Sequence, residues 1–162
     1  MLKLLAIGAA PWTYARLSED LGISVSQIHS AVARSVAARL IEKSEQLLPY
    51  RPHVKEFLVH GVKYCFPAEA GQLTRGIPTA YAAPPLNSII AEASEPPPVW
   101  PYAKGEIRGI SLLPLHRAVP QAAIKDQKLY QMLALLDSIR SGRAREREYA
   151  VRELTHRIDH AW

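Results

Sequence analysis

The chain has one cysteine among its 162 residues, so it cannot form an internal disulfide or a cysteine-based zinc site. A reducing cytoplasm is the simplest setting for it, and Cys65 is expected to be a small buried hydrophobe. Long apolar runs are also missing. The run in MLKLLAIGAAPW (residues 1–12) is about seven residues long, whereas a membrane-spanning helix needs about 20. We therefore expect a short amphipathic or buried helix there and no membrane partner.

Several motifs typical of enzymes are lacking as well. The sequence contains no G-x-G-x-x-G, Walker loop, G-x-S-x-G or H-E-x-x-H pattern. His156 and His160 could share a helix face toward zinc if a third ligand approached, but exposure to solvent is the favoured interpretation. No metal site, cofactor or catalytic residue is predicted, and a non-enzymatic protein is favoured over an enzyme.

Basic residues outnumber acidic ones by 20 to 15, which gives a formal net charge of +5. This balance favours polyanionic partners without identifying one. The hydrophobic content of 48% is sufficient for a buried core. Composition is therefore compatible with a folded protein that binds nucleic acid.

Proline divides the chain into three zones: residues 1–66, 67–125 and 126–162. The middle zone carries most of the prolines, so we expect irregular turns and extended chain there, without long helices or central strands. Within it, EPPPVWP (residues 95–101) is expected to be a polyproline II spacer rather than a docking ligand. GEIRGIS (residues 105–111) is the best strand candidate. GQLTRGIP (residues 71–78) is expected to be a turn or, alternatively, an anion-binding loop that uses Arg75.

The last zone predicts a pair of helices. Asp126 can cap a helix that ends at Ser141–Gly142, where glycine would take the left-handed conformation, and its apolar stripe consists of Leu129, Met132, Leu133, Leu136 and Ile139. A second helix over residues 143–158 carries Ala150, Val151, Leu154 and Ile158 on one side. These stripes are expected to serve the core or a dimer seam. Glu–Arg pairs four residues apart favour a salt-bridged second helix over a nucleic-acid patch.

The first zone holds the most informative stretch, RLSEDLGISVSQIHSAVAR (residues 16–34). Thr13 can cap a helix that ends before Gly22, and glycine supplies a sharp turn. Ser24 can cap the next helix, and Gln27 completes a capping box three residues later. The spacing therefore predicts a helix-turn-helix.

Helical periodicity gives the second helix two different faces. Val25, Ile28, Val32 and Val36 are expected to point inward and His29 to be a core histidine, whereas Ser26, Gln27, Ser30 and Arg34 point outward. Short side chains let a helix enter a major groove, where Gln27 can pair with adenine and Arg34 can reach guanine or phosphate. Alternatively, Gln27 only closes its capping box and Arg34 is solvated.

The segment RLSEDLGISVSQIHSAVARSVAARLI (residues 16–41) resembles bacterial winged-helix transcriptional regulators. The resemblance implies phosphate contacts from Thr13, Tyr14 and Arg16, and a groove-facing set of Ser24, Ser26, Gln27, Ser30 and Arg34. The sequence departs from the family after the second helix, because IEKSEQLLPYRP (residues 41–52) lacks the glycine or asparagine turn of a wing hairpin. A loop in its place could still bring Lys43 and Arg51 to phosphate.

Residues 53–86 are also similar to uncharacterised bacterial helix-turn-helix proteins, some associated with toxin–antitoxin genes. Two hypotheses follow for a mainly α protein with an N-terminal helix-turn-helix. In the first, a cytoplasmic homodimer binds double-stranded DNA at a palindrome and regulates transcription. In the second, an antitoxin-like or adaptor protein binds a protein partner through its middle and C-terminal regions.

Overall fold

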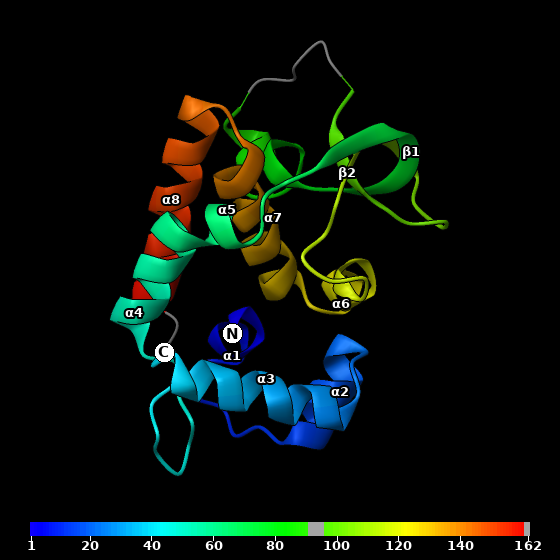
Figure 1. Cartoon of the computed structure of the whole chain (residues 1–162). Coiled ribbons are helices and arrows are strands. Elements are labelled where there is room, and N and C mark those ends of the chain that lie inside the picture. Colours follow the sequence, from blue (N-terminus) through cyan, green and yellow to red (C-terminus); the bar gives the residue numbers. More distant parts are fainter. Residues whose placement is uncertain (91–95, 161–162) are drawn as a thin grey trace.

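The computed structural model describes residues 1–90 and 96–160, and it is mainly helical (Figure 1). The first half contains α1 (Leu2–Ile7), α2 (Tyr14–Leu21), α3 (Val25–Ala37) and α4 (Arg51–Glu56), which continues through a π-helical turn at Phe57–Gly61 into α5 (Val62–Cys65). The middle contains β1 (Ala70–Pro78), short 3₁₀ turns at Ala80–Ala82 and Leu86–Ser88, β2 (Pro98–Pro101) and β3 (Ile107–Leu112). The chain continues with α6 (Val119–Lys125), α7 (Gln127–Ser141) and α8 (Ala144–Asp159). No helix within the described ranges is long and apolar enough to cross a membrane.

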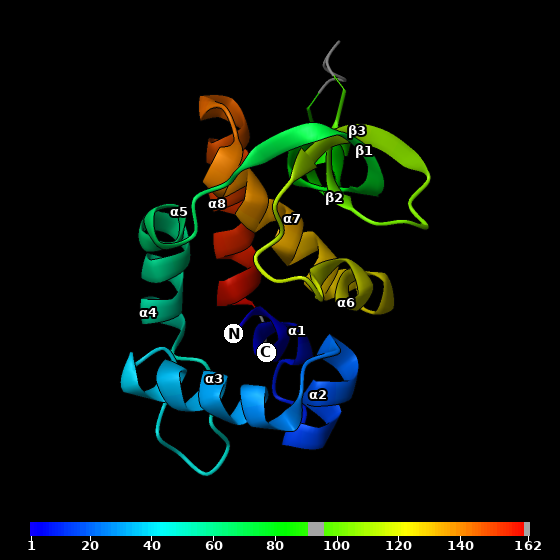
Figure 2. The same ribbon diagram turned by 45° about the vertical axis from the view of Figure 1, so that its right-hand side comes forward.

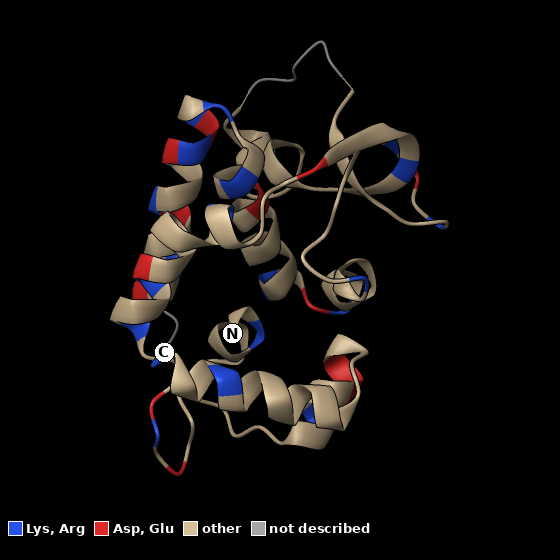
Figure 3. Cartoon of the chain, viewed as in Figure 1, with Lys and Arg blue, Asp and Glu red and all other residues tan. Residues whose placement is uncertain are grey.

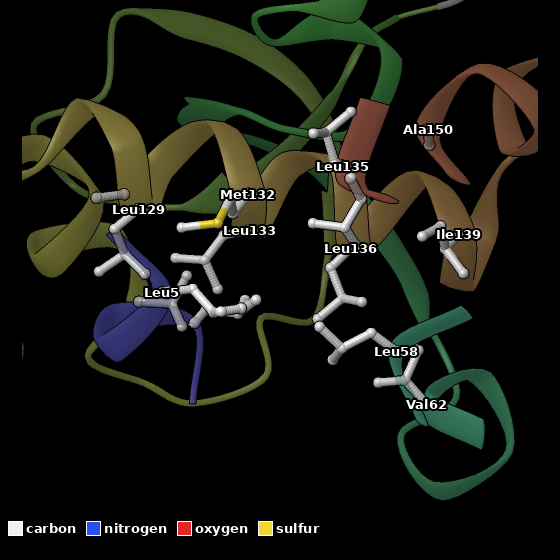
Figure 4. Close-up of a cluster of buried hydrophobic side chains, with 14 of the residues drawn as sticks. Leu5, Leu58, Val62, Leu129, Met132, Leu133, Leu135, Leu136, Ile139 and Ala150 are labelled. Atoms are coloured by element: carbon white, nitrogen blue, oxygen red, sulfur yellow. The ribbon is translucent and has the colours of Figure 1, made fainter. Parts of the chain in front are cut away.

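The larger hydrophobic core surrounds α7. Every residue of α7 from Met132 to Arg140 is buried, as is typical of a helix enclosed on all sides. Leu5 of α1, Leu58 and Val62 lie against α7 together with Ala150 of α8 (Figure 4). The predicted stripes of α7 and α8 therefore pack inside one chain, where they cannot also form the seam of a dimer.

A smaller cluster holds the helix-turn-helix together. It contains Leu4, Leu17, Ile28, Val32 and Ile41. Because Leu2 and Leu5 of the same short α1 belong to the larger cluster, α1 lies between the two. Figure 2 shows α2 and α3 at one end of the molecule and the strands at the other. Residues 51–65, which the sequence grouped with the helix-turn-helix, contribute Val54, Leu58 and Val62 to the larger core.

The proline-rich middle is not irregular throughout, because its three strands form a small closed barrel. β1 pairs antiparallel with both β2 and β3, and β2 pairs parallel with β3. The strand predicted at residues 105–111 is confirmed as β3. The turn or anion-binding loop predicted at residues 71–78 is wrong, because these residues belong to β1. The polyproline prediction for residues 95–101 is wrong for Pro98–Pro101, which is β2; Glu95 lies outside the described residues.

Two features allow strands to form among so many prolines. Pro97 and Pro98 take part through their carbonyl oxygens, which accept hydrogen bonds of 2.9 Å from the backbone N–H groups of Ile110 and Thr79. These contacts use only the carbonyl oxygen, so the N–H group that proline lacks is not needed there. Gly76 and Gly109 let the strands approach closely, because a Cβ atom there would collide with the carbonyl oxygens of Trp100 and Pro97.

A buried polar network fastens the barrel to α7. The Asp137 carboxylate accepts hydrogen bonds from Trp100 Nε1 at 2.6 Å, Thr79 Oγ1 at 2.8 Å and Arg140 Nη1 at 2.6 Å. Arg140 also donates to the carbonyl oxygens of Phe66 at 2.7 Å and Pro67 at 3.1 Å. Burial raises the pKa of Asp137, while the Arg140 charge and the two neutral donors oppose that shift.

Two further local predictions are wrong. Cys65 is exposed rather than buried, because it ends α5 on the outer side of the larger core. Gly142 follows α7 as predicted, but its φ of −67° and ψ of 154° are extended rather than left-handed. The next helix begins two residues later and packs back against α7.

Candidate nucleic-acid interface

Local hydrogen bonds fix both ends of the turn between α2 and α3, as predicted. Thr13 Oγ1 accepts from the backbone N–H of Arg16 at 3.1 Å, and Gly22 takes the left-handed conformation with a φ of 65°. Ser24 Oγ accepts from the Gln27 N–H at 3.4 Å, while Gln27 Oε1 accepts from the Ser24 N–H at 3.3 Å. The capping box is therefore complete, and it sets where α3 begins.

The two faces of α3 largely follow the predicted pattern. Ile28 and Val32 are buried and Val36 is half-buried. Val25 is 42% exposed, so its predicted inward position is wrong. It occupies the first turn of α3, beyond the reach of the Leu17 and Ile28 cluster. The predicted groove-facing residues are all exposed: Ser24, Ser26, Gln27, Ser30 and Arg34.

Aromatic rings join α3 to the beginning of α2. The imidazole of His29 stacks on the ring of Tyr14, with centroids 3.6 Å apart and planes inclined by 12°. Trp12 meets Tyr14 edge-on at 5.3 Å. His29 is exposed, so the prediction of a core histidine is wrong. Helical periodicity alone could not decide which face of α3 His29 belongs to, because this residue lies on the border between the serine face and the apolar face.

Basic and acidic groups are balanced around this surface. Four basic and four acidic residues lie between positions 13 and 50. Figure 3 accordingly shows both signs on α2 and on the loop after α3, whereas α3 itself carries basic charge only. Arg16 is exposed, but its Nε lies 3.0 Å from Asp20 Oδ1. Arg34 and Lys43 are both exposed, and neither forms an ion pair with another residue in the described part of the chain. Arg39, which was not predicted, is also exposed at the end of α3.

A partly buried triad of charged side chains attaches the helix-turn-helix to the rest of the chain. Lys3 Nζ of α1 lies 2.9 Å from Asp20 of α2 and 2.8 Å from Asp126, the cap of α7. Burial alone would lower the pKa of Lys3, but hydrogen bonds to Asp126 and Asp20 raise it above the ordinary value. Burial alone would raise the pKa of Asp126, but Lys3 and the Leu129 N–H lower it.

The segment after α3 forms a hairpin-like loop. Ile41 and Pro49 form an isolated antiparallel bridge, flanked by hydrogen bonds of 2.9 Å from Glu42 N–H to Leu48 O and from Tyr50 N–H to Leu40 O. Leu47, rather than a glycine or asparagine, takes the left-handed conformation, with a φ of 49°. The loop carries Lys43 beside the carboxyl end of α3 and projects away from α7 and α8 (Figure 1).

Arg51 lies apart from the other predicted residues. Its Nη1 donates to the Asp159 carbonyl oxygen at 2.9 Å, because α4 packs beside the end of α8. The neighbouring Lys55 pairs with the Asp159 side chain at 2.7 Å. The structure thus brings Thr13, Tyr14, Arg16, Lys43 and the outward face of α3 to one end of the molecule, and directs Arg51 toward α8.

The histidine pair on α8 offers no more than two ligands. His156 and His160 stack with their centroids 4.4 Å apart. Within residues 1–90 and 96–160, no group of three histidine, cysteine or acidic side chains is arranged to hold a metal. Comparison of the chain with protein-family models, with curated proteins and with solved structures gives no match.

Proposed function

We propose that this chain is a non-enzymatic, cytoplasmic DNA-binding regulator of the winged-helix type, with α3 as its recognition helix. The outward face of α3 carries the proposal. It combines short Ser26 and Ser30 side chains with Arg34, while Ile28 and Val32 anchor the opposite face in a core. An exposed helix with such small side chains can approach the floor of a major groove.

Different residues would supply affinity and specificity. Gln27 and Arg34 would read base edges, since amide and guanidinium groups make the bidentate contacts that discriminate bases. Thr13, Tyr14 and Arg16 would contact phosphates beside α2, and Lys43 would do so from the loop, which would act as a minimal wing. The balanced charge implies a weak salt dependence. Two cationic phosphate contacts per protomer, from Arg16 and Lys43, give a slope of log K against log salt of about −2.

A palindromic site would require a homodimer, because one recognition helix reads only a few base pairs. The seam cannot use the stripes of α7 and α8, which are buried. Tyr64 and Leu113, which are 78% and 52% exposed, offer an alternative. Arg140 holds this region together, since it donates to the carbonyl oxygens of both Phe66 and Leu113.

The same exposed apolar residues favour a second candidate function, an antitoxin-like or adaptor protein that binds a protein partner. Leu113 lies in the middle region that this hypothesis assigned to partner binding, and Tyr64 lies just before that region in the sequence. Deletion of residues 126–162 would not test it, because α7 forms the centre of the core. The double variant Tyr64→Ser/Leu113→Ser is the sharper perturbation, since it removes exposed apolar surface while leaving the core intact.

Selection from a random pool of duplexes at fixed, moderate salt tests the main proposal. We expect the native chain to enrich a defined sequence, and Gln27→Ala and Arg34→Ala to change the preferred bases. Lys104→Ala is the matched control, because it removes one exposed positive charge from the loop between β2 and β3. Failure to enrich any sequence, or an equal change with Lys104→Ala, would exclude base reading by α3. Loss of a protein partner in Tyr64→Ser/Leu113→Ser, when the native chain selects no duplex, would favour the adaptor function.

A further inference from the structure

An apolar pocket of about 400 Å³ lies between the helix-turn-helix and the larger core. The helix-turn-helix contributes Leu21, Ile23 and Ala31 to its wall. The larger core contributes side chains from α5, α6 and α7, among them Val62, Ala122 and Leu133. The walls therefore come from both hydrophobic units, and the pocket is large enough for a small molecule.

The lining gives the chemical class of an occupant. Apolar side chains dominate the wall, and Figure 4 shows Leu133 and Leu136 projecting from α7 on the side of Leu58. Water gains little in such a space, because it finds few hydrogen-bond partners there. An apolar molecule in this pocket would instead remove its surface from water and gain dispersion contacts with the apolar walls.

The polar groups at the pocket show what the occupant's polar end must be. His116 Nδ1 accepts a hydrogen bond of 3.1 Å from the Ala118 backbone N–H, so the neutral ring carries its proton on Nε2. That N–H can donate to an oxygen acceptor. Two other basic groups belong to the wall, Lys3 and the Met1 α-amino group. Lys3 is already paired with Asp20 and Asp126. Burial lowers the pKa of the Met1 α-amino group, which disfavours its charged form. An anionic ligand would thus enter an apolar space with little positive charge available to compensate it, which is costly.

We propose that this pocket binds a small, uncharged, mainly apolar molecule with one oxygen acceptor, such as a medium-chain ketone or ester. Bound there, the molecule would contact Ile23 and Ala31 on one side and Leu133 on the other. It would thereby fix the position of α3 relative to α7. The regulatory consequence rests on the proposed function: a ligand that changes this position changes DNA affinity, and DNA changes ligand affinity by the same factor.

Calorimetric titration without DNA tests the binding site itself. The probes are 2-decanone and nonanoate, which have the same number of non-hydrogen atoms but differ in charge. We expect saturable binding of one 2-decanone per chain and binding of nonanoate that is weaker by about tenfold or more. Absence of saturable ketone binding, or equal binding of nonanoate, would overturn the proposal.

Variants place the ligand in the pocket. Ala31→Phe fills the pocket from α3 at a half-buried position and should weaken ketone binding by about tenfold or more. Ala118→Phe fills it from the opposite wall and serves if the first variant does not fold. His116→Phe keeps the ring but removes the donor, and should weaken binding by about fivefold. Ala103→Phe, at an exposed position in the loop between β2 and β3, is the control. Native-like binding by both pocket-filling variants, each checked for folding by circular dichroism, would show that the ketone binds elsewhere.

The two proposals fail separately. Ketone binding in a chain that selects no duplex would support the pocket and contradict DNA recognition. Duplex selection by a chain that binds no ketone would do the reverse.

Discussion

Replacement of Arg140 by methionine should destabilise the fold strongly, because it would leave the Asp137 carboxylate buried without its cation. The Asp137 residue is 1% exposed, and the Arg140 side chain is 2% exposed. Removal of one partner from a buried, hydrogen-bonded ion pair costs about 3–5 kcal/mol. The carbonyl oxygens of Phe66 and Pro67 would also lose their donor. The free energy of unfolding of a domain is about 5–15 kcal/mol, so Arg140→Met should lose a large fraction of its stability.

Urea unfolding at neutral pH measures this loss. The exposed Arg145→Met is the control and should change the free energy of unfolding by no more than about 0.5 kcal/mol. The double variant Asp137→Asn/Arg140→Met should recover part of the loss, because it removes the uncompensated charge. A loss below about 1 kcal/mol for Arg140→Met, with an unchanged dependence on urea, would refute the role assigned to this pair.

Three other perturbations test the helix-turn-helix and its attachment. Ile28→Ala should lower the free energy of unfolding by about 2–5 kcal/mol, whereas Val25→Ala should change it by about 0.5 kcal/mol or less; similar losses in urea unfolding would contradict the two faces of α3. Ser24→Ala should cost about 1 kcal/mol through loss of the α3 cap, and an unchanged thermal midpoint would argue against the capping box. Because the folded-state pKa of Asp126 is lowered, its ion pair with Lys3 stabilises above the unfolded-state pKa and is lost as pH falls through the folded-state pKa. Asp126→Asn keeps a capping oxygen but should reduce this acid-side decline, and an identical decline between pH 5 and pH 2, within about 0.3 kcal/mol, would contradict the role of the pair.

Sequence reasoning succeeded where the signals were local. The boundaries of α2 and α3 follow from Thr13, Gly22 and Ser24, each of which acts on backbone groups a few residues away. Asp126 likewise caps α7, with its Oδ1 accepting from the Leu129 N–H at 3.0 Å. Such contacts need no knowledge of the rest of the fold, so a single sequence is sufficient to predict them.

The barrel was missed because its determinants are distant in sequence. Gly76 matters only because β2 returns to place Trp100 against it, and Gly109 only because Pro97 lies opposite. Local rules treat the prolines as breakers of strands, although their carbonyl oxygens still accept hydrogen bonds. Asp137 was similarly hidden, since a polar residue on an amphipathic helix is normally assigned to solvent.

In the candidate interface, α3 contains one feature that could be predicted from the sequence and one that could not. Exposure of Ser26, Ser30 and Arg34 followed from helical periodicity. The stacking of His29 on Tyr14 did not, because it depends on how α2 crosses α3. Arg51 was assigned to phosphate from its sequence position after α3, but α4 turns toward α8 and takes Arg51 with it.

Amide chemical shifts during titration with a selected duplex test the central claim most directly. If α3 is the recognition helix, the largest changes should fall on Ser26, Ser30 and Arg34, with smaller ones at Thr13 and Lys43. The amide chemical shifts of β1–β3, at the other end of the molecule, should remain unchanged. Large changes confined to the barrel, with those three amides of α3 unaffected, would contradict DNA recognition by this helix.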